Sequence, residues 1–277
     1  MSRIQDILAK ADREGTTRHA QSQSGTLSTS SAVMTPVDGT AALEPAPFVP
    51  AAAAAPPSPS RPEPRTAQAT LHPALVAAIA PHSSVAEKYR AIRTRLTQRE
   101  ESGPLRTIAV TSPAPKAGKS ITAANLALTM AQELHRRIVL VDADLRNPAV
   151  HSLFAVEQHP GFSDVLAGDA SLDEALIYLP DFRLTILPAG RVPEYPTELL
   201  GSSAMRKTID ALRARFDRTL IDLPAVVPLA DVGTVAPFVD GALMVVRAGV
   251  TQRPVLDQAL AAFEPDKVIG LVLNETD

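Results

Sequence analysis

The chain has 277 residues, 45% of them hydrophobic, which is enough for one domain with a sizeable core. Its 27 Lys and Arg against 30 Asp and Glu give a net charge of −3, so charge alone provides no attraction to nucleic acid or anionic lipid. The absence of cysteine excludes disulfides, thiolate nucleophiles, Cys-ligated zinc and iron–sulfur clusters, and it suits a reducing cytoplasm.

Two N-terminal segments precede the predicted domain. Residues 1–15 have an apolar stripe at helical spacing, formed by Ile4, Ile7, Leu8 and Ala11. Three helical turns are marginally stable alone, so we expect an amphipathic helix that orders against a surface, or a frayed cap of the domain. Residues 16–80 are rich in Ser, Thr, Ala and Pro and lack periodicity, which predicts a disordered linker or a ligand for a proline-binding module. No apolar run approaches the roughly 20 residues that span a bilayer, so attachment to a membrane is expected to need a partner.

Residues 81–277 alternate between apolar runs and helical patterns and form the predicted domain. Six runs are apolar almost throughout, as in strands that are buried on both faces of a parallel sheet: Thr107–Thr111, Ile138–Val141, Leu184–Leu187, Thr219–Ile221, Ala242–Val246 and Val268–Leu273. Helical stripes over 85–96, 205–216 and 255–263 precede or separate these runs. This pattern predicts an α/β fold with a doubly wound, mostly parallel sheet covered by helices on both faces, where ligands bind at the carboxyl ends of the strands.

The segment TSPAPKAGKS lies between the first predicted strand and an apolar helix, where α/β proteins place a phosphate-binding loop (P-loop). Backbone N–H groups and the helix N-terminus would attract phosphates, Lys119 would add a positive charge, and Ser120 would offer a hydroxyl to Mg²⁺. The G-x-x-x-x-G-K-[ST] pattern is kept at Gly118, but Pro113 replaces its first glycine. We therefore expect ATP and Mg²⁺ as cofactors, with the nucleotide contacted by Ala114, Pro115, Lys116, Ala117, Gly118, Lys119, Ser120 and Ile121.

Acidic residues follow two further predicted strands. VDADLRNP places Asp142 and Asp144 after the second strand, and IDLPAVV places Asp222 after the fourth. Carboxylates at strand ends can reach magnesium and a reacting oxygen, whereas the alternative for the Asp pair is to cap a helix. The nearby P-loop favours a metal site, and Arg146 adds a cation that we expect to face phosphate. The expected metal ligands are Ser120, Asp142, Asp144 and Asp222.

From Ser84 to Asp277 the motifs, in this order, resemble the bacterial tyrosine kinase family, cytoplasmic ATPases that work with membrane polysaccharide copolymerases in capsule and exopolysaccharide production. The likeness rests on TSPAPKAGKS with AANLA, VDADLRNP, LPAGRVPEYPTELLGS and IDLPAVVPLADV, and MSRIQDILAKADREG is similar to the N-terminal helix of stand-alone members. The resemblance implies an ATP-dependent phosphotransferase or ATPase with Lys119, Asp142 and Asp144 as catalytic residues, Asp142 being the base. It also implies a cytoplasmic protein held at the inner membrane by a copolymerase (chain-length determinant) partner.

An E-x-x-R-x-x-R motif, which the family uses for ring assembly, reads Glu87, Arg90 and Arg93 in this chain. At about 100° per residue, these side chains lie on a helix flank away from the apolar stripe. We therefore expect them to meet a neighbouring subunit in a homo-oligomer, with a solvated charged face as the alternative.

Two features depart from the family pattern. Lys116 and Ala117 stand where members commonly have Gly and Glu, which bears on phosphate affinity and turnover. The family's phosphoryl acceptors are C-terminal tyrosines, whereas this sequence ends in NETD and its three tyrosines are Tyr89, Tyr178 and Tyr195. Autophosphorylation of a tyrosine tail is therefore not expected, and phosphorylation of another protein remains open.

Two other functions fit part of the pattern. A non-catalytic, ATP-gated adaptor of the polysaccharide machinery would use the same residues without turnover. A positioning ATPase of the MinD or ParA type shares the predicted sheet, but its signature lysine, five residues before the loop lysine, is Ala114 here. Nucleic acid is not an expected partner, and binding to non-specific DNA at moderate salt would favour the positioning ATPase.

Overall fold

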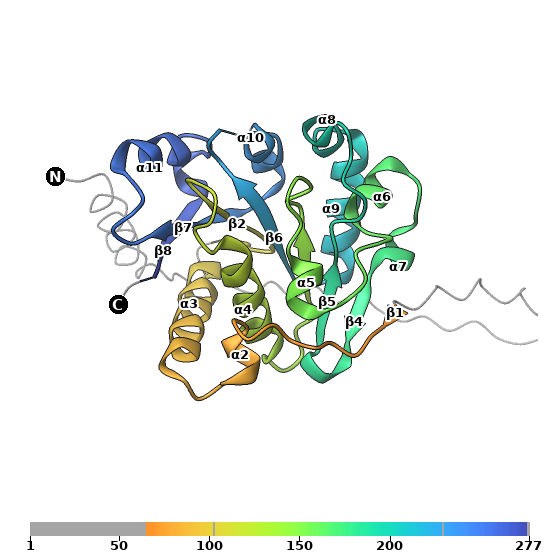
Figure 1. Cartoon of the computed structure of the whole chain (residues 1–277), viewed down its shortest axis with the longest axis horizontal. Coiled ribbons are helices and arrows are strands. Elements are labelled where there is room, and N and C mark those ends of the chain that lie inside the picture. The colour runs from red at the N-terminus through yellow and green to blue at the C-terminus, as the bar shows by residue number, and fades with distance from the viewer. Residues whose placement is uncertain (1–64, 102, 229, 276–277) are drawn as a thin grey trace, which may run out of the picture. The chain divides into compact units, whose positions relative to one another are not determined.

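The computed structural model describes residues 65–101, 103–228 and 230–275 (Figure 1). The predicted helix over residues 1–15 and the linker up to residue 64 lie outside the described residues. No helix in the described part of the chain is long and apolar enough to cross a bilayer.

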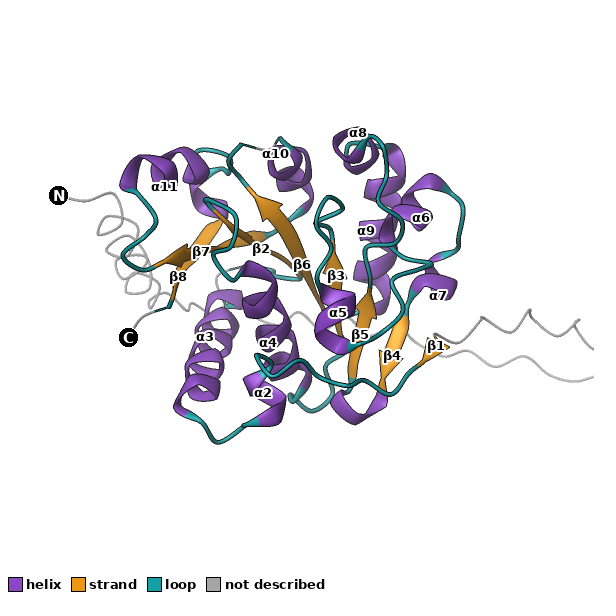
Figure 2. Ribbon diagram, in the orientation of Figure 1, coloured by secondary structure: helices purple, strands orange, loops and turns teal. Residues whose placement is uncertain are grey.

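One eight-stranded sheet forms the centre of the described residues (Figure 2). Its spatial order is β1 (Arg65–Thr66), β4 (Ile177–Leu179), β5 (Leu184–Leu187), β3 (Ile138–Asp142), β6 (Arg218–Ala225), β2 (Thr107–Ser112), β7 (Gly241–Arg247) and β8 (Val268–Asn274). All neighbouring strands are parallel except β4 and β5, which pair antiparallel. All six predicted strands are present, and the mostly parallel, doubly wound fold is confirmed.

Helices cover both faces of the sheet, because alternate residues of the buried strands point to opposite sides. One core forms where Ile108, Leu140 and Val245 meet α2 (Val76–Ile79), α3 (Ser84–Glu100), α4 (Lys119–Ala131) and α5 (Val150–Phe154). The other forms where Ala109, Val141 and Met244 meet α6 (Phe162–Ala167), α7 (Leu172–Ala175), α8 (Pro196–Leu200), α9 (Ser203–Arg215), α10 (Asp231–Val235) and α11 (Arg253–Leu260). Three short 3₁₀ helices, η1 (Pro180–Phe182), η2 (Ala236–Phe238) and η3 (Pro265–Lys267), complete the connections.

The folded region begins earlier than the sequence pattern indicates. Residues 65–80, assigned to the linker, include β1, which pairs with β4, and α2, which packs on α4. The Asn125 side chain of α4 accepts a hydrogen bond from Ala77 N at 2.9 Å and donates one to Ala74 O at 2.9 Å. A two-residue strand and a four-residue helix are too short to show periodicity, so only these distant contacts place them in the domain.

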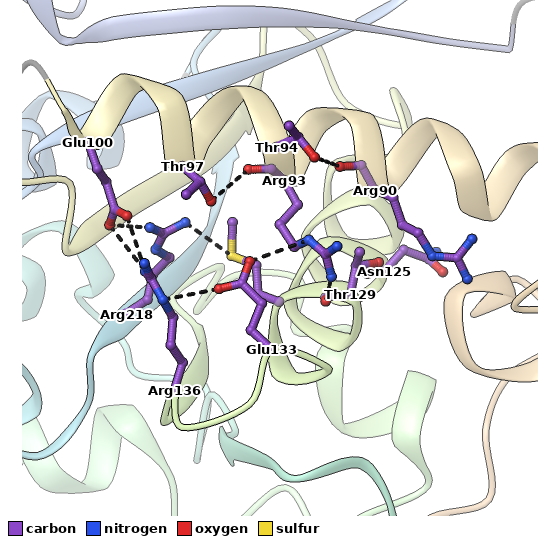
Figure 3. A network of polar contacts seen from close by, with 11 residues as sticks. Arg90, Arg93, Thr94, Thr97, Glu100, Asn125, Thr129, Glu133, Arg136 and Arg218 are labelled. Carbon is purple, nitrogen blue, oxygen red and sulfur yellow. Dashed lines mark hydrogen bonds and ion pairs between the residues drawn. The ribbon is translucent and has the colours of Figure 1, made fainter.

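A network of ion pairs joins α3, the segment that follows α4 and the first residue of β6 (Figure 3). Arg218 is 1% exposed and its guanidinium pairs with Glu100. Glu100 also binds Arg136 at 3.1 Å, Arg136 binds Glu133 at 3.1 Å, and Glu133 lies 3.4 Å from Arg93. The network therefore fixes the carboxyl end of α3 against the end of α4 and the sheet.

Candidate functional site

The P-loop connects β2 to α4 and ends at Gly118, the residue before the helix. Gly118 has φ of 85°, a backbone conformation that favours glycine, and a Cβ there would lie 2.2 Å from Asn274 Nδ2, so any other residue would also have to displace the Asn274 side chain. Asn274, at the end of β8, donates a hydrogen bond to Ala117 O at 3.0 Å. Asn274 cannot be identified from the sequence, because nothing local in LVLNET points to a loop 157 residues away.

Two other loop residues are exposed, and one of them has an unusual backbone. Lys116 and Pro115 face solvent, whereas Ala117 is buried. Lys116 has φ of 62°, a left-handed conformation that glycine adopts freely and a side chain resists. Glycine would adopt this backbone without strain, whereas Lys116 adopts it at some cost.

Lys119 lies at the first position of α4, and its ammonium is surrounded by carboxylates. Its Nζ is 2.7 Å from Asp144 Oδ2 and 3.7 Å from Asp222 Oδ1, and the side chain is 12% exposed. Burial alone would lower the pKa of this ammonium, but the charges of Asp222 and Asp144 outweigh it and hold the pKa above its ordinary value. The lysine therefore stays charged at the N-terminus of a 13-residue helix, where anions are favoured.

Asp222 is the residue that best fits a bound cation. It is 0% exposed, and neither of its carboxylate oxygens has a hydrogen-bond partner among the described residues. Burial raises its pKa to about 6, although Lys119 and Ser120 nearby act to lower it. A buried carboxylate without hydrogen-bond partners is stabilised by a nearby cation. Mg²⁺, which proteins bind through one or two carboxylates together with water and phosphates, is such a cation. The described residues contain no group of three His, Asp or Glu that could enclose a metal ion by themselves.

Asp142 braces the loop that follows β3. Its Oδ2 accepts hydrogen bonds from Ala149 N and Val150 N, both at 2.9 Å, and its Oδ1 accepts one from Asp144 N at 3.2 Å. Burial, and then the charge of Asp222, raises the pKa of Asp142 to about 7. Asp142 therefore caps the start of α5, as the capping alternative for the Asp pair predicts. Asp144 instead faces Lys119.

Arg146 binds Asp231 and Thr197 in the structure. Its Nε is 2.7 Å and its Nη2 3.1 Å from the two carboxylate oxygens of Asp231 in α10, and Nη2 lies 3.0 Å from Thr197 Oγ1 in α8. Asp231 is a bidentate partner, so Arg146 would have to exchange this ion pair to contact a phosphate. Ser120 lies beside Lys119, its Oγ 3.1 Å from Nζ, and Ile121 is on the exposed side of the same turn.

The three residues of the expected assembly motif differ in their surroundings. Glu87 is 63% exposed and pairs with Arg90, which also donates to Pro81 O. Arg93 instead donates to Thr129 O at 2.9 Å and lies beside Glu133, both on the α4 side. The flank of α3 that carries Arg93 packs on α4, so Glu87 is exposed beside Arg90, whereas Arg93 would have to leave Thr129 and Glu133 to contact another subunit.

A hollow of about 320 Å³ lies beside the P-loop. Its lining comes from the loop and from the segment between β7 and α11: Ala114, Pro115, Ala117, Arg247, Val250, Thr251, Gln252 and Val255. The lining combines apolar side chains with one cation and with hydroxyl and amide groups.

The two raised carboxyl pKa values predict how stability depends on pH in metal-free protein. Asp142 and Asp222 bind protons more tightly in the folded state, where their pKa values are about 7 and about 6, than in the unfolded state, where the pKa of an aspartate is about 4. Protonation of these two carboxyls therefore stabilises the folded state. This stabilisation is complete below about pH 4 and is lost as the pH rises through 6 and 7. With EDTA present, we expect the Tm at pH 5 to exceed that at pH 8 by roughly 4 °C or more, since 1 kcal/mol moves the Tm of such a domain by about 2–4 °C. Asp222→Asn should flatten this difference, and an equal slope in both proteins would contradict the prediction.

Comparison with known proteins gives the family. No protein-family model matches the chain. The chain is 32% identical over 202 residues to the tyrosine-protein kinase YwqD of Bacillus subtilis, covering 72% of this chain and 85% of YwqD. It is 36% identical over 204 residues to the succinoglycan biosynthesis transport protein ExoP of Rhizobium meliloti, covering 72% of this chain and 26% of ExoP. The crystal structure of the chimerical protein CapA2B2 has a TM-score of 0.70 at 29% identity, covering 78% of this chain and 94% of that one. The chain therefore belongs to the bacterial tyrosine-protein kinase family.

Proposed function

We propose that the protein is a magnesium-ATP-dependent phosphotransferase or ATPase that regulates the polymerisation or export of an exopolysaccharide. The observation that carries the proposal is the position of Lys119, at the N-terminus of α4 and within 4 Å of Asp144 and Asp222. A charged lysine, a helix N-terminus and the unsatisfied carboxylate of Asp222, beside Asp142 on the adjacent parallel strand, suit a nucleoside triphosphate with its metal.

Different residues of this site would have different roles. The loop residues 114–121 would bind the phosphates, and Asp144, Asp222 and Ser120 would hold Mg²⁺, which supplies charge neutralisation of the phosphate oxygens. The hollow beside the loop would receive the nucleoside. Asp142 keeps the loop after β3 in place, and its pKa of about 7 suits a general base if a proton is exchanged there.

The partner and the location follow from the family and from the relatives' names. We infer a membrane polysaccharide copolymerase as the partner, because ExoP is named as a succinoglycan biosynthesis transport protein and matches this chain over 26% of its own length. The protein would work on the cytoplasmic side of the inner membrane, where ATP is supplied, and would assemble with further copies through the exposed end of α3 that carries Glu87 and Arg90.

A non-catalytic adaptor is the second candidate. The observation that favours it is the hydrogen bonding of Asp142, whose carboxylate already accepts three backbone N–H groups and is less free to act as a base. Both candidates bind ATP. Incubation with magnesium and γ-labelled ATP, with a Glu/Tyr copolymer as an added acceptor, separates them: release or transfer of label supports the enzyme, and binding without either supports the adaptor. Calorimetry that detects no ATP binding would contradict both.

Filling the hollow tests whether it receives the nucleoside. Val255, in α11, lines the hollow, and Val255→Trp is expected to weaken ATP binding about tenfold while leaving the binding of inorganic tripolyphosphate within about twofold. Calorimetric titration with the two ligands measures this difference. Val85→Trp, at an exposed position of α3, is the matched control and should change neither affinity. Equal loss for both ligands would show that the substitution disturbs the P-loop instead.

A further inference from the structure

Tyr195 is the tyrosine whose side chain the fold leaves in solvent. All three tyrosines of the chain lie in the described residues. Tyr195 is 61% exposed, whereas Tyr89 packs against the core beside α4 and Tyr178 is half-buried in β4 between β1 and β5. A phenol that receives a phosphoryl group has to enter a nucleotide site, so accessibility separates Tyr195 from the other two.

The loop that presents Tyr195 is anchored at both ends. At its start, Gly190 exchanges hydrogen bonds with Gln158 at 2.7 and 3.1 Å, and Ser163 Oγ donates to Arg191 O at 2.6 Å. At its end, Pro196 begins α8 and Thr197 binds Arg146 and Asp231. Fixed anchors lower the entropy lost when such a loop docks, so its exposed side chains are presented in a defined position.

The anchoring contacts also bring the loop to the edge of the sheet that carries the P-loop. Arg146, which holds Thr197, comes two residues after Asp144, and the charges of Asp144 and Glu198 both act on its guanidinium. Asp144 in turn binds Lys119 at 2.7 Å. Tyr195 and the candidate phosphate site therefore belong to one end of the molecule, where the carboxyl ends of the parallel strands meet.

A proton acceptor is already in contact with the phenol. The Tyr195 hydroxyl donates a hydrogen bond to Glu194 Oε1 at 2.8 Å. This hydrogen bond is also the main reason why the pKa of Tyr195 lies above its ordinary value, so the phenol is protonated at neutral pH and must lose its proton during any transfer. A carboxylate within hydrogen-bond distance is the geometry that general-base assistance requires.

We propose that Tyr195 is a phosphoryl acceptor of the protein's own kinase activity, with Glu194 as the residue that takes its proton. The proposal rests on the proposed function, because magnesium-ATP is the donor. The phenolic oxygen forms a bond to the γ-phosphorus, the bond from that phosphorus to the β,γ-bridging oxygen breaks, ADP leaves, and the phenolic proton passes to Glu194. The modification adds a dianion next to Glu194 and Glu198 in an exposed loop.

The test uses the full chain with magnesium and γ-labelled ATP, followed by peptide mapping by mass spectrometry, and a Glu/Tyr copolymer as an independent acceptor. We expect the label on Tyr195, a loss of at least tenfold of self-labelling in Tyr195→Phe, and unchanged labelling of the copolymer by that variant. Tyr178→Phe is the matched control and should label itself like the wild type. Glu194→Gln should slow transfer to Tyr195 about tenfold or more without slowing transfer to the copolymer.

The outcomes separate this inference from the proposed function. Undiminished self-labelling in Tyr195→Phe, or a wild type that labels the copolymer and not itself, would overturn the role of Tyr195 while the kinase activity stands. No label on either the chain or the copolymer would overturn both.

Discussion

Replacing Lys119 by methionine is expected to weaken magnesium-ATP binding by roughly 100-fold and to abolish turnover. The ammonium is the cation at the N-terminus of α4, and Asp144 and Asp222 keep it charged. A hydrogen bond to a charged group is worth about 1.5–3 kcal/mol, or roughly 10- to 150-fold in affinity, and methionine keeps the length of the side chain while removing the charge. Calorimetric titration with ATP in the presence of Mg²⁺ measures the loss.

The control for this variant is Lys207→Met, which makes the same substitution at an exposed position of α9. It should bind ATP like the wild type. Circular dichroism should show that both variants keep their secondary structure, so that a loss of binding is not a loss of fold. Equal ATP affinity in Lys119→Met and Lys207→Met would show that Lys119 does not bind phosphate. The proposed function would then lose its main support.

Replacing Glu100 by glutamine is expected to lower the free energy of unfolding by about 3 kcal/mol, because it leaves the buried guanidinium of Arg218 without a counter-charge. The guanidinium stays charged because arginine does not lose its proton in proteins. Among the described residues, its other hydrogen bond runs from Nη1 to Met130 Sδ, at 3.9 Å. A loss of this size corresponds to a Tm lower by roughly 6–12 °C in a domain of this length. Urea unfolding and a thermal melt measure it.

Two further variants test the cause. Glu101→Gln makes the same substitution at the next, exposed residue and should change stability by less than about 0.5 kcal/mol. Adding Arg218→Met to Glu100→Gln removes the buried charge along with its partner and should recover most of the loss. If Glu100→Gln is no less stable than Glu101→Gln, the ion-pair network of Figure 3 does not hold α3 to the sheet.

The fold was largely predictable because its central strands are buried on both faces. Runs such as Ile138–Val141 and Ala242–Val246 are apolar at every position, and the one-sided stripe of α9 matches the core that it covers. The pairing of β1 with β4 was not predictable, because two and three residues carry no periodic signal and the partners are more than a hundred positions apart. For the same reason, the sequence pattern predicts a domain that begins at residue 81, whereas the structure has β1 at Arg65–Thr66.

By itself the sequence determined the elements and their chemistry: a strand, loop and helix around Gly118 and Lys119, and carboxylates at two strand ends. The tertiary structure alone decided which groups meet. In the folded chain, Asp144 binds Lys119, Asp142 accepts hydrogen bonds from the backbone at the start of α5, Arg146 pairs with Asp231, and Asn274 binds the P-loop. Local patterns report burial and backbone preference, whereas the partner of a side chain depends on how segments distant in the chain pack together.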